Sequence, residues 1–465
     1  MKKIIYVLLF SLCTASVVFS QATGRVQLFG HLDKRHGGNT NFYSGCWGWT
    51  NPNDNREYGI IGCINGTSIV EVTNADSMRE VAYIPGAPSG WREAKTWSHY
   101  AYVVIDATPN PDSMSGVHII DLSQLPDTAI LVKKFNYANG NKNIKRSHEI
   151  FIDENGYMYL FGNQNWQPSG VLIFSLANPT SPQFVGEWQP NSEYIHDGFV
   201  RNDTIFGAAI YGAGIFIADI HNKSNPVAIA QIQYPNAGTH NIWTSSDGRT
   251  LFSTDEIGNT AKTLKVWDIS NLPNYTMIDE YTPNPAAIVH NVQVRDSLAF
   301  VSWYSQGLVV ANISDPANVT TVGTYDSYPG ADGGYNGAWG IFAFVSGTKA
   351  IISDRSTGTY ACVVLPPVSV PAAEESFPAK TQLAQNYPNP FNPYTIIHYS
   401  LAVASHISLK IYDAIGKEIA ILINEFRQSG NYEVRFDGSK MPSGVYFMQL
   451  TTVSGTETKK IILQK

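Results

Sequence analysis

Four histidines open short, apolar, β-branched runs, and each is followed by an acid or an amide. The dipeptides are His148-Glu149, His196-Asp197, His240-Asn241 and His290-Asn291. Imidazole and carboxylate groups together form ligand sets for zinc, manganese or iron, and a histidine beside a carboxylate is also an acid–base pair. The pattern therefore raises a bound metal ion and acid–base catalysis as two possible roles, beside a purely structural one.

The histidines recur because the chain contains an internal repeat of a short strand, a second strand, a third strand usually led by glycine, and an outer strand. Third strands are predicted at 66–72, 116–122, 170–176, 214–220, 263–269, 307–313 and 358–364. Only six outer strands follow them, and the segment RVQLFGHLD (25–33) has the character of the missing one. We therefore predict an all-β chain in which residues 21–367 form a seven-bladed β-propeller, with the last blade closed by the N-terminal strand, since closure hides the sheet edges. Six or eight blades remain alternatives.

The repeat predicts a belt of equivalent residues on the innermost strands, around a central channel. Its members are Trp47, Arg92, His148, His196, His240, His290 and Trp339, and the next positions are Gly48, Glu93, Glu149, Asp197, Asn241, Asn291 and Gly340. Successive side chains of a strand point to opposite faces, so a histidine and the residue after it cannot easily serve one ligand. We expect each imidazole to bond the carboxylate or amide of the next blade, because buried polar groups need partners.

A ligand at the channel mouth remains open beside this structural role. The candidate ligand-binding ring is Arg92, His148, Glu149, His196, Asp197, His240 and His290. The candidate metal ligands are His148, His196, His240 and His290, for calcium or a transition metal. We assign no catalytic residue.

Other stretches carry weaker signals. Asp255 and Glu256 end a second strand without the alternating oxygen ligands of a calcium loop, and we predict a solvated turn there. The aromatic loops 86–91 and 328–339 could form a face for a carbohydrate or a peptide, although ordinary packing is the favoured role. The sequence contains no nucleophile elbow, zinc-protease or phosphate-binding motif.

Composition limits the kinds of partner. Charged residues make up only 15% of the 465 residues, while 38 glycines and 25 tyrosines suit short strands and tight turns. The net charge is −7, without a run of lysine or arginine after the first residues. Neutralising many phosphates requires clustered cations, so we expect no nucleic-acid partner.

Residues 1–20 are predicted to be a secretory signal peptide, with two lysines, an apolar core and small residues before a cut at Gln21. Leu12 stands where a lipoprotein signal ending at Cys13 would need a small residue, so we expect no lipidation. No other stretch has the ~18 apolar residues of a membrane span. We therefore expect an exported chain without a transmembrane segment, located outside the cell or on the outer-membrane surface.

Export permits disulfides. Cys46 and Cys63 flank a predicted hairpin and are the candidate disulfide pair, whereas Cys362 is expected to be a buried thiol. The chain has no C-x-x-C zinc pair.

After the repeats, residues 368–384 are rich in Pro, Ala and Glu and are predicted to be a linker. Residues 385–465 show a new alternating pattern that predicts a small antiparallel β-sandwich. The segment YPNPFNP (387–393), with IYDAIGKEI and MPSGVYFMQL, resembles the type A C-terminal sorting domain of the type IX secretion system of Bacteroidetes. In that family the domain directs passage across the outer membrane and is usually cleaved.

Residues 25–365 resemble the choice-of-anchor B family, secreted propellers with LVIVD-type repeats. The resemblance rests on CWGWTNPNDNREYGIIGCINGTSIVEVTN, GWREAKTWSHYAYVV, SHEIFIDENGYMYLFGN, GTHNIWTSSDGRTLFSTDE and VHNVQV. It implies a secreted propeller with a variable C-terminal anchoring or sorting signal, and it brings no established reaction and no catalytic residues.

We therefore expect a binding or scaffold protein outside the cell, with the type IX secretion machinery and an extracellular protein or glycan as partners. The alternative is a metal-dependent hydrolase or lyase with its site at the channel mouth.

Overall fold

The computed structural model describes residues 22–35, 42–106, 116–140, 142–144, 146–163, 166, 169–258, 262–345, 347–367 and 380–465. The predicted signal peptide (1–20) lies outside these residues. The described residues form an all-β structure of antiparallel sheets, with 3-10 turns at η1 (Ala75–Ser77), η3 (Pro190–Ser192) and η4 (Tyr304–Gln306) and no α-helix among them. The chain divides into two compact units, Met1–Pro367 and Val368–Lys465.

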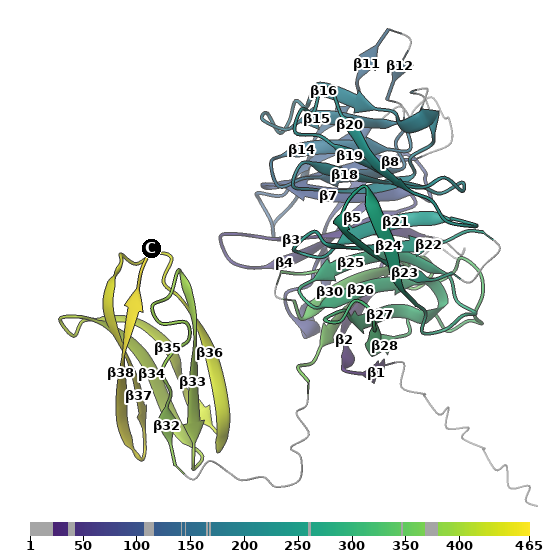
Figure 1. Cartoon of the computed structure of the whole chain (residues 1–465). Helices are drawn as coiled ribbons and strands as arrows, with labels where there is room; N and C mark the ends of the chain where they lie inside the picture. The colour runs from purple at the N-terminus through teal and green to yellow at the C-terminus, as the bar shows by residue number, and fades with distance from the viewer. Residues whose placement is uncertain are drawn as a thin grey trace, which may run out of the picture. The chain divides into compact units, whose positions relative to one another are not determined.

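The described part of the first unit contains seven four-stranded meanders, in which each strand pairs with its neighbour (Figure 1). Their first strands are β3 (Tyr43–Thr50), β7 (Arg92–Trp97), β13 (Glu149–Ile152), β17 (Asp197–Arg201), β21 (Thr239–Thr244), β25 (Val289–Arg295) and β29 (Ala338–Ala343). Their second strands are β4 (Glu57–Cys63), β8 (Tyr100–Ile105), β14 (Tyr157–Phe161), β18 (Thr204–Ala209), β22 (Thr250–Asp255), β26 (Leu298–Trp303) and β30 (Lys349–Asp354).

The remaining strands complete each sheet. Third strands are β5 (Gly66–Glu71), β9 (Val117–Asp121), β15 (Val171–Ser175), β19 (Gly214–Asp219), β23 (Leu264–Asn271), β27 (Gly307–Asn312) and β31 (Gly358–Val364). Fourth strands are β6 (Arg79–Pro85), β10 (Ile130–Phe135), β16 (Gln183–Trp188), β20 (Val227–Ile232), β24 (Asn274–Tyr281), β28 (Thr320–Tyr325) and β2 (Val26–Leu32). Two features that the sequence did not predict are β1 (Ala22–Gly24), a fifth strand beside β28, and a hairpin of β11 (Ala138–Asn139) and β12 (Lys142–Asn143).

The first strands contact one another in chain order, from β3 through β7, β13, β17, β21 and β25 to β29, and β29 in turn contacts β3. The last sheet takes its fourth strand from the N-terminal segment, because β2 pairs with β31 from Val26 opposite Val364 to Leu32 opposite Thr359. The series of contacts is therefore closed, and the candidate functional residues lie at the ends of these first strands.

The glycines that lead the third strands have a backbone reason. Gly307 and Gly358 have φ angles of 69° and 107°, a left-handed region that favours glycine. A Cβ atom at Gly307 would also collide with the carbonyl oxygen of Tyr325 on the neighbouring fourth strand. The strand therefore enters the sheet by a turn that other residues would strain.

The predicted disulfide between Cys46 and Cys63 is wrong, because both thiols are free and buried. A bulge in β3 shifts the register, so that Cys63 lies opposite Tyr43 while Cys46 lies opposite Ile61. The Cys46 thiol instead points to the carbonyl oxygen of Ile351, 3.9 Å away on β30. Burial raises the pKa of both thiols to about 12, which keeps them protonated.

The second unit consists of two antiparallel sheets around one apolar core. One contains β32 (Gln382–Leu383), β33 (Tyr394–Leu401) and β36 (Gly430–Asp437). The other contains β35 (Glu418–Arg427), β34 (Ser405–Asp413), β37 (Gly444–Thr452) and β38 (Gly455–Leu463). Strand β32 falls within the predicted linker, so the sheet begins at Gln382 rather than after residue 384.

Candidate functional site

The four histidines lie side by side at the starts of consecutive first strands. His148 and His196 directly precede β13 and β17, whereas His240 and His290 lie in bulges of β21 and β25. Consecutive ring centroids are close to one another. The distance is 4.2 Å between His148 and His196, 4.6 Å between His196 and His240, and 4.0 Å between His240 and His290. Residues at a bulge leave the regular hydrogen-bond ladder of the sheet. The bulges therefore allow the side chains of His240 and His290 to reach the neighbouring sheet.

Trp339 continues this stack at the start of β29. Its ring centroid is 4.5 Å from that of His290, and its backbone carbonyl oxygen accepts a hydrogen bond of 2.8 Å from His290 Nδ1. The Arg355 guanidinium lies 4.7 Å from the Trp339 ring centroid. A carbonyl oxygen can only accept, so this bond places a proton on His290 Nδ1 and leaves the Nε2 lone pair free in the neutral ring.

Two residues of the predicted belt behave differently. Arg92 is fully buried at the start of β7, and its guanidinium donates to the carbonyl oxygens of Cys63, at 2.7 Å, and Ala87 rather than facing the imidazoles. Burial lowers the pKa of Arg92 to about 10.

Trp47 does not occupy the belt position, contrary to the prediction. The bulge of β3 places Ser44 there. The Ser353 hydroxyl donates to the Ser44 carbonyl oxygen just as the Ser302 hydroxyl donates, at 2.6 Å, to that of Trp339. The bulge inserts residues that the repeat spacing alone did not reveal, and Trp47 lies farther along the strand.

Residues that follow the second strands directly complete the surroundings of the histidines. Asp106 follows β8, Glu256 follows β22, Tyr304 follows β26 and Arg355 follows β30. Asp106 Oδ2 is 2.9 Å from His148 Nδ1, and Glu256 Oε2 is 3.7 Å from His240 Nε2. Because second strands run back toward the starts of the first strands, the residue after each one arrives at the belt.

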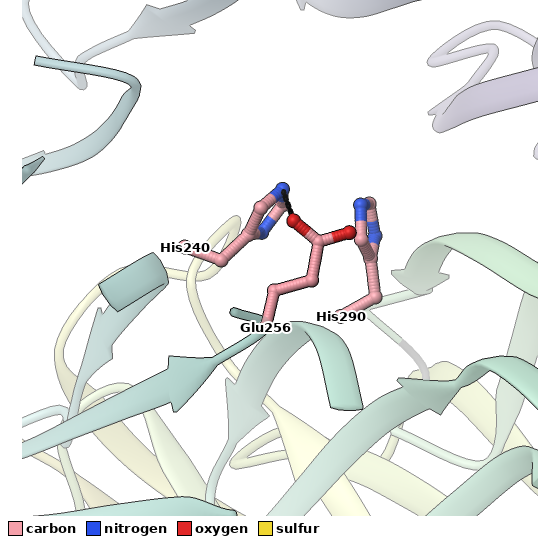
Figure 2. A group of neighbouring side chains, drawn as sticks. All are labelled: His240, Glu256 and His290. Carbon is pink, nitrogen blue, oxygen red and sulfur yellow. Dashed lines mark ion pairs between the residues drawn. The ribbon is translucent and has the colours of Figure 1, made fainter. Parts of the chain in front are cut away.

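Glu256 is the functional candidate that the sequence missed. Glu256 and Asp255 are both buried. The predicted solvated turn at these two residues is therefore wrong. Figure 2 shows the Glu256 carboxylate between the imidazoles of His240 and His290. One ligand atom from each of these three residues lies within 4.8 Å of the others. The signal that could have found Glu256 is its position directly after a second strand.

Burial governs the charge of these imidazoles. Burial, followed by repulsion from His148 and the other histidines, holds the pKa of His196 well below its usual range. Burial, followed by repulsion from His240, holds the pKa of His290 well below its usual range. Burial also lowers the pKa of His240, although the attraction of Glu256 opposes this shift. The three rings are therefore neutral at neutral pH and offer lone pairs instead of charge.

The carboxylates of Glu93, Glu149 and Asp197 each accept a hydrogen bond from a side chain of another first strand. Lys95 Nζ donates to Glu149 Oε1 at 3.1 Å, and Asn241 Nδ2 donates to Asp197 Oδ2 at 2.7 Å. Farther round, Trp339 Nε1 donates to Glu93 Oε1 at 2.9 Å. The predicted ring of imidazole–carboxylate bonds is therefore wrong, because Glu149, Asp197 and Glu93 take lysine, amide and indole donors. The imidazole of His148 instead bonds the carboxylate of Asp106, which follows a second strand of the neighbouring sheet.

These carboxylates are strongly perturbed. Burial, followed by repulsion from Glu149, raises the pKa of Glu93 and of Asp197 well above the usual range. The pKa of Lys95 is raised: burial opposes the charge, but the attraction of Glu149, Glu93 and Asp197 outweighs it. A small cavity of about 30 Å³ lies among these groups.

A larger cavity of about 480 Å³ opens at the other ends of the first strands. Its walls include Trp47, Phe151, Phe199 and Trp243, with Arg201, Arg295 and Glu154. Phe199 packs 4.5 Å from Trp243 and 5.1 Å from Phe151. Period-2 alternation brings these side chains to the same face as Glu149, Asp197 and Asn241.

Several residues that line this cavity carry hydrogen-bond donors, beside the Glu154 carboxylate. Trp243 Nε1 and Gln293 Nε2 are buried without an acceptor among the described residues. Arg201 donates to backbone oxygens of Thr244 and Ser245, and Arg295 donates to that of Ala343. Neither guanidinium is ion-paired with a carboxylate in the described ranges. The cavity therefore suits a ligand that supplies acceptors.

Comparison with known proteins assigns the second unit. Residues 385–464 match the family model described as "Secretion system C-terminal sorting domain". The match confirms the C-terminal sorting domain predicted from the tail, and it implies export through type IX secretion to the cell surface or the extracellular space. No helix among the described residues is long and apolar enough to cross a membrane.

The first unit receives no assignment from these comparisons. No curated protein was found to match the chain. Among solved structures, PorZ of Porphyromonas gingivalis, described as an essential bacterial surface component of the type IX secretion system, is similar with a TM-score of 0.42 and 10% identity. The alignment covers 93% of this chain and 61% of that chain, and at this TM-score the likeness carries no argument.

Proposed function

We propose that residues 22–367 form a seven-bladed β-propeller of the choice-of-anchor B type, and that it acts as a binding protein outside the cell. The propeller is supported by the seven meanders, by the first-strand contacts that return from β29 to β3, and by the pairing of β2 with β31. Export of this unit is the task of the sorting domain at 385–464.

The ligand site is the cavity of about 480 Å³, and the observation that carries the proposal is its donor-rich, aromatic lining. Binding pockets combine apolar and aromatic walls with a few polar groups that fix orientation. Here Trp47 and Trp243 provide ring faces, while Arg201 and Arg295 provide positive charge without a carboxylate partner within ion-pair distance among the described groups. Arginine recognises carboxylates by paired hydrogen bonds. The ligand is therefore a molecule with a ring or apolar face and a carboxylate.

Extracellular glycans with uronic acids and acidic peptides both present this chemistry. Titration calorimetry with a uronate oligosaccharide, its neutral counterpart and an acidic aromatic peptide separates them. We expect one carboxylated ligand to bind, the neutral sugar to bind at least about 10-fold more weakly, and the double variant R201Q/R295Q to lose about 10- to 100-fold in affinity, since a hydrogen bond to a charged group contributes about 1.5–3 kcal/mol.

R79Q is the matched control, because Arg79 is an exposed arginine of β6 that pairs with Glu71. Equal loss of affinity in R79Q and R201Q/R295Q would contradict the assignment of the cavity. Absence of binding by any carboxylated ligand would contradict the proposed ligand class.

A metal-dependent hydrolase or lyase remains the second candidate. The arrangement of His240, Glu256 and His290 is the specific observation in its favour. A turnover assay with and without added zinc tests it: zinc-dependent hydrolysis or elimination lost in E256Q would support it. Equal rates in that variant would contradict it.

A further inference from the structure

We propose that His240, Glu256 and His290 bind one divalent transition metal ion of the zinc class. This inference goes beyond the binding role proposed above and does not depend on it, because the site lies at the starts of the first strands rather than in the aromatic cavity. The three ligands come from two neighbouring sheets, and two of the ligands, His240 and His290, lie in bulges.

The separation of the ligand atoms fits a small ion. Ligands about 2.1 Å from a tetrahedral zinc ion lie about 3.4 Å from one another. His240 Nε2 and Glu256 Oε2 are 3.7 Å apart, and the three ligand atoms all lie within 4.8 Å of each other. Figure 2 shows the carboxylate between the two imidazoles.

The orientation of His290 is fixed for coordination through Nε2. Its Nδ1 is used by the 2.8 Å hydrogen bond to Trp339 O, and its Nε2 is buried with no hydrogen-bond partner in the part of the chain that is described. The whole residue is only 1% exposed. A buried imidazole nitrogen without a partner is costly in a site that has no use for its lone pair, and a metal ion would satisfy it.

Glu256 is oriented by a neighbouring group in the way metal-binding carboxylates are. The Tyr304 hydroxyl donates to Glu256 Oε1 at 2.7 Å, so that Oε2 is the oxygen nearer to His240. Hydrogen bonds of this kind hold metal ligands in place, and their loss lowers metal affinity by about 10- to 100-fold. Tyr304 is a positioning residue in this site.

The donor set selects the class of ion. Two imidazole nitrogens and one carboxylate oxygen suit zinc and its neighbours, whereas calcium takes about 6–8 oxygen ligands. Calcium, which the sequence left open, is therefore disfavoured here. Three protein ligands leave a fourth position for water or for a ligand group.

Metal analysis of the full chain tests the site. Protein purified without a chelator or a metal-affinity tag is loaded with Zn²⁺, freed of excess metal and measured by mass spectrometry for metal per chain. We expect about one zinc per chain in the wild type, and a loss of at least about 10-fold in affinity in E256Q and H240Q. Tyr304→Phe weakens binding by about 10- to 100-fold without removing a ligand.

H148Q is the matched control, since His148 belongs to the same stack but its Nδ1 is bound to Asp106 at 2.9 Å. We expect H148Q to keep its zinc. Equal loss of zinc in H148Q and E256Q would overturn the assignment of the three ligands, and so would a wild type that takes up no zinc.

Co²⁺ absorption and thermal melts exclude a simple folding defect as the cause of metal loss. The wild type should show the visible bands of tetrahedral Co²⁺ and a higher melting temperature with metal, because a ligand that binds only the folded state stabilises it. A folded E256Q variant should show neither effect. A wild type whose melting temperature does not respond to zinc, with no Co²⁺ bands, would overturn the proposal while leaving carboxylate binding at the cavity unaffected.

Discussion

The two units of the chain bury their strands in different ways. In the first unit, strands such as β4 and β19 are buried along almost their whole length, on both faces. In the second unit, β33 and β34 alternate between buried and exposed residues. Sheets that pack between two neighbours need apolar residues on both faces, whereas a sheet with one face in water needs them at every second position.

This difference indicates where each unit can carry function. The second unit keeps its core residues apolar, so recognition by the secretion machinery must use its exposed faces and edges. The first unit gathers polar groups along its first strands. The four stacked imidazoles lie beside Asp106 and Glu256. Lys95 interacts with the buried carboxylates of Glu93, Glu149 and Asp197. The candidate sites of the first unit therefore lie at the ends of its first strands.

Deletion of the second unit should have the largest effect. A chain ending at Pro367 should fold its first unit but fail to reach the outside of the cell, because the sorting domain at 385–464 is absent. Immunoblots of cell and medium fractions measure this, with the full chain as control. Normal export of the shortened chain would contradict the assignment of export to the second unit.

Core substitutions should act on one unit at a time. Leu409 and Ile217 are both fully buried, the first in the tail and the second in β19. We expect L409A and I217A each to lower the free energy of unfolding of their own unit by about 2–5 kcal/mol, through lost burial and the cavity left behind. Denaturant unfolding monitored by hydrogen exchange measures the transition of each unit separately. A shift of both transitions in either variant would contradict the expectation that the two cores are independent.

The pH dependence of stability should also differ between the units. His118 on β9 is buried, without a hydrogen-bond partner among the residues described, and burial lowers its pKa to about 4. Below pH ~6.5 the unfolded chain binds a proton there that the folded chain does not. The free energy of unfolding of the first unit should therefore fall between pH ~6.5 and ~4, by up to about 3 kcal/mol from this residue.

His118→Leu should reduce this slope in urea melts of the first unit by the part that His118 contributes. The histidines His196, His240 and His290, whose pKa values are also lowered, keep their own part. The transition of the second unit is the internal control, since its histidines, His398 and His406, are exposed. An unchanged slope in the variant would show that His118 is not the group responsible.

Much of the fold could be predicted because each sheet repeats the same order of strands. The glycine-led third strands, the alternation of strands and turns, and the pairing of the N-terminal segment with 358–364 follow from repeat spacing, and the structure contains each of them. The sorting domain was recognisable from YPNPFNP and the strands after it, and the family match confirms it. His148, His196, His240 and His290 could be placed together because they occupy equivalent positions of consecutive repeats.

Contacts between neighbouring sheets were decided only by the tertiary structure. Bulges at residues 44–45 separate Cys46 from Cys63 and move Trp47 out of the belt, and repeat spacing cannot reveal them. The burial of Glu256 beside His240 depends on the path of the chain after β22. Glu93 and Glu149 are bonded by Trp339 and Lys95, which extend from first strands of other sheets. The sequence by itself determined which residues repeat and so which ones meet at the centre. Which atoms face each other there was determined by bulges and by packing between sheets, since an inserted residue changes the direction of every side chain around it.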